Sequence, residues 1–336
     1  MTNIIDRQSA RDVLAKAWIS TNLNFGLEKP GRAFSSCSKP SEMWFSANEG
    51  NLPSSIVQVF LQMNSQKVYG PLRELDNSAF DERKKIVAEK VNLFTKNEMS
   101  ILSTDDKIFL LNEISSKKMS SEQMKARRKI YKSFSLDQRF AAWDEMKREK
   151  LINELKADGE ILDAREKWKS LTDAERIKIL TKVASIQARI YGFYEVPIYL
   201  RCFTKSDGTE DKSYHGGYDI GREEISINLN DRSTLESFSE SINTITHESA
   251  HNMQAQLASD FYGNKLTPDD ERYNQAKIFY ANWATGGYVT RYEDPSEYQI
   301  ILDAGYKNQP VEVQARKTGD AVGAALEIGL LEKIGF

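Results

Sequence analysis

The segment His247-Glu248-Ser249-Ala250-His251 holds two of the three histidines in this chain of 336 residues. In a helix that turns about 100° per residue, the two histidines and the glutamate share an arc of about 100°. Two imidazoles four residues apart can then bind one metal ion, and the glutamate can reach a water on that ion. The segment therefore predicts a metal site for hydrolysis, with His247 and His251 as ligands and Glu248 as general base.

The residues before this segment predict the helix that must position it. Residues 233–236 have the pattern of a capping box, Ser-Thr-Leu-Glu. Apolar side chains then recur at intervals of three and four residues, at Leu235, Phe238, Ile242 and Ile245. Neither proline nor glycine occurs from Ser233 to Asp260, so we expect one long helix with the motif deep inside it.

Two alternating segments, 196–203 and 224–230, predict strands, and a capped helix is expected from Thr172 to about Tyr191. Between the two strands, residues 206–208 carry turn signals, and residues 214–219 form a glycine-rich approach to the second strand. The second half of the chain therefore predicts a small mixed sheet packed against the helix that carries the motif.

The first half is rich in helix signals and poor in strand signals, and its first 55 residues are the least regular part apart from a short helix at about 9–19. We expect an α+β protein with a helical N-terminal region, residues 1–170, and a second domain, residues 171–336. The N-terminal region would bind a partner or a target.

Composition excludes several classes of protein. The chain has a net charge of −3, 40% apolar and 28% charged residues, and neither an 18-residue apolar run nor a secretory signal at its N-terminus. A basic cluster at 117–129 has acidic residues nearby, which argues against nucleic-acid binding. Cys37 and Cys202 are too few for a disulfide framework or a thiolate metal site. A cytoplasmic protein that neither inserts into membranes nor binds nucleic acid is expected.

The order of the elements resembles the zincin metallopeptidases over residues 172–330, since strands that end in Ile225-Ser226-Ile227-Asn228 precede the motif helix. The resemblance implies one Zn²⁺ ion and a protein or peptide substrate, which pairs with the edge strand before that helix. We expect residues 224–230 to be this edge strand. A hydrolytic domain behind a helical region is also similar to bacterial effector and toxin metallopeptidases. That similarity implies delivery by a specialised secretion system, with a chaperone or delivery machinery bound to the N-terminal region.

A catalytic zinc ion takes three protein ligands, so one ligand must lie outside the motif. Gln254 and Leu257 stand where the metzincin pattern has glycine and histidine, which excludes that subgroup. The glutamate-ligand branch of the zincins implies a carboxylate downstream, and both Glu271 and Glu312 are candidates. Glu312 is preferred because its helix face continues in small residues, which would allow a close approach to the motif helix: Ala315, Gly319 and Gly323.

These enzymes add a donor that stabilises the oxyanion, and the sequence offers His215, Tyr306, Tyr288 and Tyr292 without deciding among them. His215 and Tyr306 are the assignments that we carry forward. Three functions are compatible with the sequence. The first is a zinc endopeptidase, the second a zinc hydrolase that acts on peptidoglycan or another amide, and the third a helical interaction protein without catalysis.

Overall fold

The computed structural model describes residues 77–115, 119–205, 208–284, 288 and 306–334. Within these residues the chain forms two compact units. One unit contains residues 136–280 and 310–334, and the other contains 77–135 and 281–309. The predictions for the first 55 residues and for Cys37 lie outside the described part.

The unit that contains residues 77–135 is helical. It contains α4 (Asn77–Leu93), α5 (Lys96–Ile101), α6 (Thr104–Ile114) and α7 (Ser121–Ser133). Capping boxes begin three of these helices, at Thr95, Ser103 and Ser120. Their apolar faces share one core, which includes Val91, Leu111 and Ile130.

The unit that carries residues 247–251 begins further upstream than the boundary expected at residue 170. Helices α8 (Gln138–Ala157) and α9 (Gly159–Lys167) belong to it. The physical reason is the apolar face of α8, which packs on α10 (Asp173–Tyr191) and α15 (Pro310–Ile334). Leu151 and Leu155 on α8 are fully buried. A short 3₁₀ helix, Trp168–Ser170, joins α9 to the segment before α10.

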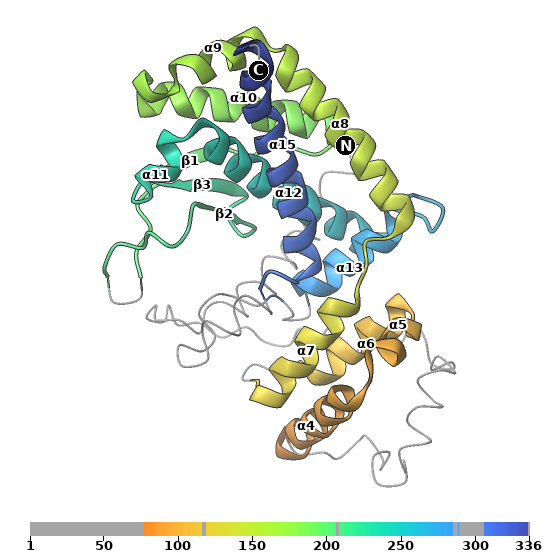
Figure 1. The fold of residues 1–336 in the computed structure, drawn as a ribbon. Helices are drawn as coiled ribbons and strands as arrows, with labels where there is room; N and C mark the ends of the chain where they lie inside the picture. Colours follow the sequence, from red (N-terminus) through yellow and green to blue (C-terminus); the bar gives the residue numbers. More distant parts are fainter. Residues whose placement is uncertain (1–76, 116–118, 206–207, 285–287, 289–305, 335–336) are drawn as a thin grey trace. The chain divides into compact units, whose positions relative to one another are not determined.

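The expected α+β character is confirmed, because a three-stranded mixed sheet lies among these helices (Figure 1). Its strands are β1 (Ile198–Arg201), β2 (Gly216–Asp219) and β3 (Glu224–Asn228). Strand β3 pairs with β1 in parallel, with Ile198 opposite Ile225, and with β2 antiparallel, with Gly217 opposite Ser226.

The prediction that residues 224–230 form the edge strand is wrong. The strand order is β1-β3-β2, so β3 is the central strand and β2 is an edge. Every residue of β3 is buried, as expected for a strand with neighbours on both sides. Strand β2 lies within the glycine-rich approach at 214–219, where the sequence did not predict a strand, and it packs against the helix that carries the motif.

The helix with the motif is α12 (Phe238–Tyr262), and it is preceded by a separate short helix, α11 (Arg232–Glu236). The expected single helix from Ser233 is therefore interrupted, and the predicted cap is wrong. Asp231 caps α11, and Ser237, in an extended conformation, caps α12 by accepting from the backbone N–H of Glu240. Ser237 thus ends α11 and begins α12, although neither proline nor glycine occurs at this break.

Helices α10 and α15 pack against α12. The expected helix at 172–191 is confirmed as α10, which has a capping box at Thr172 and ends at Gly192 with a φ of 78°. Helix α15 runs along α12 (Figure 1). Helix α13 (Tyr273–Ala284) precedes α15 in the chain. Across the described residues, none of the helices is long and apolar enough to cross a membrane.

Candidate metal centre

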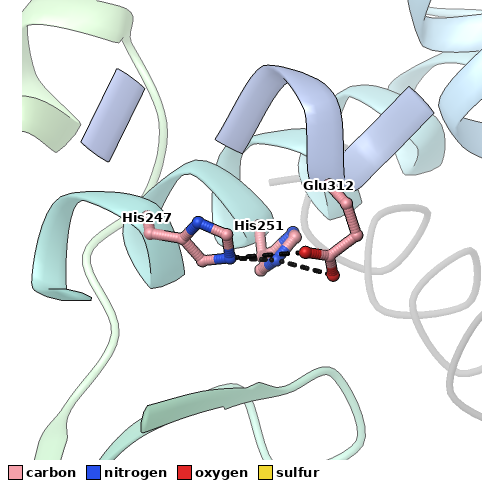
Figure 2. Close-up of side chains that lie close together, drawn as sticks. All are labelled: His247, His251 and Glu312. Carbon is pink, nitrogen blue, oxygen red and sulfur yellow. Dashed lines mark hydrogen bonds and ion pairs between the residues drawn. The ribbon is translucent and has the colours of Figure 1, made fainter. Parts of the chain in front are cut away.

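The motif lies in the buried middle of α12, as predicted. The apolar stripe that leads to it is in the core, with Ile242 and Ile245 fully buried. Packing of α12 against α10, together with the Ser237 cap, holds the helix in place. The side chains of His247 and His251 then project from one face of α12 (Figure 2).

The small-residue face of α15 brings its first turn to the same place. A Cβ atom at Gly319 would lie 2.9 Å from the backbone oxygen of Asn243 and 3.3 Å from Cβ of His247. A Cβ atom at Gly323 would lie 3.2 Å from the backbone oxygen of Ser239. Both glycines therefore face α12 directly, which is the close approach that the sequence predicted.

This approach places Glu312 beside both histidines, and its side chain is 0% exposed (Figure 2). In the part of the chain that the structure describes, His247, His251 and Glu312 form a group that could hold a metal ion. Glu271, the other candidate for the third ligand, is exposed and lies outside this group.

The distances between the three side chains fit one tetrahedral ion. The two Nε2 atoms of His247 and His251 are 3.1 Å apart, and they lie 3.6 Å and 3.4 Å from the carboxylate oxygens of Glu312. Ligand atoms about 2.0–2.1 Å from a tetrahedral zinc ion are about 3.3 Å from one another. The donor set of two imidazoles and one carboxylate is also one that zinc accepts in catalytic sites.

The electrostatics of the metal-free group favour a cation. Burial alone would raise the pKa of Glu312, but His251, His247 and Arg316 together outweigh burial and lower that pKa. For His251, burial works toward a lower pKa, and the charge of Glu312 raises it above the usual value. Burial, together with His251, lowers the pKa of His247. Glu312 is therefore a buried anion whose charge is balanced by the proton on His251. A metal ion could take the place of that proton.

Two polar side chains contact this group. Nη2 of Arg316 donates to Glu312 at 3.2 Å, the pairing expected from their spacing. Oε1 of Gln254 lies 2.9 Å from Nδ1 of His251. In the sequence, Gln254 indicates only that the chain lacks the metzincin pattern. The spacing of three residues between His251 and Gln254 on one helix is the feature of the sequence that could have indicated this contact.

Glu248 lies between the metal group and the edge strand β2. Its side chain is only 8% exposed, and it accepts a hydrogen bond from the backbone N–H of Tyr218. A Cβ atom at Gly216 would come within 3.5 Å of Cγ of Glu248, so glycine allows β2 to lie against α12 here. Burial raises the pKa of Glu248 to about 7, which suits a general base at neutral pH.

His215 stands directly before β2, where its ring is held by residues at the start of α11. Its Nδ1 atom is 2.5 Å from Oδ2 of Asp231 and 2.8 Å from Oγ1 of Thr234. The ring is close enough for its charge to lower the pKa of His247 after larger effects from burial and His251. Asp231 was not predicted to have a role, because its position before a helix signals only a cap.

Tyr306, the other predicted oxyanion donor, belongs to the helical unit, where its ring packs edge-on against Tyr288. Tyr288 stacks in turn on Trp283. Tyr292 lies outside the described residues. A role for any of these tyrosines in the metal centre stays a prediction.

No family model, curated protein or solved structure showed significant similarity to this chain.

Proposed function

We propose that the protein is a zinc-dependent metalloendopeptidase with a zincin-like site. The observation that supports this most strongly is the convergence of His247, His251 and Glu312 beside a buried Glu248 whose pKa is raised to about 7. Two imidazoles and a carboxylate are the ligands of one class of zinc peptidase site. A neighbouring carboxylate with a pKa near neutrality supplies the proton acceptor that peptide hydrolysis needs.

The ligands would be His247, His251 and Glu312, and zinc at this position would polarise a scissile carbonyl and lower the pKa of a water molecule. Glu248 would take a proton from that water on its carboxylate and then donate it to the departing amine. Burial of Glu248 makes both transfers feasible because it brings the pKa of the carboxyl close to neutral pH.

His215 would stabilise the oxyanion. Asp231 accepts the proton on Nδ1, so only the doubly protonated ring can donate through Nε2. When protonated, the ring would supply a donor for the negative charge that develops on the carbonyl oxygen. The edge strand β2 follows His215 in the chain and packs against α12, the helix that carries Glu248. An extended peptide would pair with the outer edge of β2.

The direct test is cleavage of a broad peptide library by zinc-loaded protein, with Glu248→Gln as the matched variant. We expect wild-type cleavage and a loss of about 10²- to 10⁴-fold in the variant, the usual contribution of a general base. Zinc content should be equal in both proteins. If both proteins cleave peptides equally, or neither cleaves any, the peptidase proposal is wrong.

The same two proteins separate the alternative functions. Release of fragments from peptidoglycan or small amides, without peptide cleavage, would indicate the second class of hydrolase. Indistinguishable behaviour in every assay would indicate an interaction protein.

A further inference from the structure

Two buried glutamine side chains connect the metal centre to a carboxylate on α8. The connection runs from His251 through Gln254 on α12 and Gln314 on α15 to Asp144. We infer that this amide relay positions the metal centre: it fixes the tautomer of His251 and holds the two ligand helices in register. The inference rests on the proposed zinc site, and it adds three residues that no motif assigns.

The relay is continuous and inaccessible to solvent. Nδ1 of His251 is 2.9 Å from Oε1 of Gln254, Nε2 of Gln254 is 2.6 Å from Oε1 of Gln314, and Nε2 of Gln314 is 3.0 Å from Oδ1 of Asp144. The side chains of Gln254, Gln314 and Asp144 are each 0% exposed. Water therefore does not compete for these hydrogen bonds.

The buried carboxylate sets the direction of the relay. Oδ2 of Asp144 accepts from Nη1 of Arg148 at 2.8 Å, and Oδ1 accepts from the hydroxyl of Tyr191 at 3.3 Å. Gln314 must then turn its amide nitrogen toward Asp144 and its oxygen toward Gln254.

The same constraint passes along the relay to the ligand. Gln254 donates to the oxygen of Gln314, so its own oxygen faces the ring of His251. Nδ1 of His251 must carry the proton, which leaves the lone pair of Nε2 for a metal ion. An outer partner that fixes the tautomer in this way raises the affinity of a histidine for its metal.

Gln254 also ties α12 to the first turn of α15. Its Nε2 atom donates at 2.8 Å to the backbone oxygen of Val311, the residue before Glu312. One amide thus contacts the second histidine at one end and the chain beside the carboxylate ligand at the other. Loss of this amide would leave buried partners unsatisfied and loosen the distance between two ligands.

Gln256 provides a matched control on the same helix. It is also a buried glutamine. Its Oε1 atom accepts from the backbone N–H of Tyr194 at 2.8 Å, and its Nε2 atom donates to the backbone oxygen of Tyr194 at 3.1 Å. It has no hydrogen bond to a ligand of the metal centre among those of the described residues. Replacing Gln256 should reduce stability without a specific effect on metal affinity.

The test is the zinc Kd of the full chain, measured by competition with a chelator for wild type, Gln254→Met, Gln314→Met and Gln256→Met. We expect a weakening of roughly 10- to 100-fold for Gln254→Met, the usual cost of losing an outer partner of a metal ligand. Gln314→Met should weaken zinc binding by a smaller factor, and Gln256→Met should resemble wild type. In the zinc-loaded wild type, ¹⁵N spectra of the three histidines should show a protonated, slowly exchanging Nδ1 on His251.

Equal affinities for Gln254→Met and Gln256→Met would overturn the inference. If Gln254→Met does not fold, Gln314→Met decides, and an affinity equal to that of Gln256→Met overturns the relay. Wild-type protein that binds no zinc would overturn both this inference and the proposed function. Zinc affinities in the expected order without any peptide cleavage would support the relay and contradict the peptidase proposal alone.

Discussion

The two sides of the candidate site differ in how firmly they are fixed. On the helical side, His251, Glu312 and Gln254 are buried and joined by hydrogen bonds or ion pairs between α12 and α15. On the strand side, the side chain of His215 is 60% exposed, and among the described residues it is held at one ring nitrogen, Nδ1. The proposed metal ligands therefore lie in a packed interior, whereas the residue proposed to contact a substrate lies at an open edge.

The largest effect is expected where the two ligand helices touch. Gly319→Ala places a methyl group against the backbone of Asn243 and beside His247, so α15 must move away from α12. We expect a loss of about 2–3 kcal/mol in the free energy of unfolding, typical of overpacking, together with weaker zinc binding. Thermal unfolding and chelator competition measure the two effects.

Gly159→Ala is the matched control, since a Cβ atom there would meet nothing within 4 Å. If both alanine variants keep wild-type stability and zinc affinity, the close contact of α12 with α15 does not support the metal centre.

A smaller effect is expected from the buried charge of Glu248, and it depends on pH. The pKa of Glu248 is about 7 in the folded protein and about 4.3 in an unfolded chain. The stability that this raised pKa contributes is complete below the unfolded value, and it is lost as the pH rises through the folded value.

Metal-free Glu248→Gln should therefore be more stable than metal-free wild type at pH 8, by an amount on the order of 2 kcal/mol. The difference should shrink as the pH falls from 8 to 5. Denaturant unfolding at several pH values measures it. A difference that does not change with pH would show that Glu248 is not a buried carboxyl with a raised pKa.

The smallest effect is expected on the strand side. Asp231→Asn keeps a capping side chain for α11 but removes the charge beside His215. We expect peptide cleavage to fall by about 10-fold, which corresponds to about 1.4 kcal/mol in the transition state, with zinc affinity unchanged. Kinetics at saturating and limiting substrate, with zinc content, check this. If zinc affinity falls together with cleavage, Asp231 supports the metal ligands and not the oxyanion donor.

The helical side could be predicted from the sequence because its signals are local. The spacing of His247 and His251, the stripe at 242–245 and the small residues at 319 and 323 each follow from helix periodicity alone. The small residues Ala315, Gly319 and Gly323 on one helix face favour Glu312 over Glu271 as the third ligand.

The strand side could not be predicted in the same way. Strand β2, with the sequence Gly-Gly-Tyr-Asp, has neither alternation nor branched residues, and it forms because β3 and α12 offer partners. The role of Asp231 depends on a histidine 16 residues earlier in the chain. The link from Gln254 to Asp144 depends on the packing of three helices, which local patterns do not specify.

The most direct test of the metal centre is the zinc stoichiometry and Kd of wild type, Glu312→Ala and Glu271→Ala. Glu271 is the competing glutamate and serves as the control. We predict one zinc ion per chain in wild type and Glu271→Ala, and a greater loss of affinity in Glu312→Ala than the roughly 10- to 100-fold loss typical of outer partners. Zinc bound to Glu312→Ala with wild-type affinity would contradict the account.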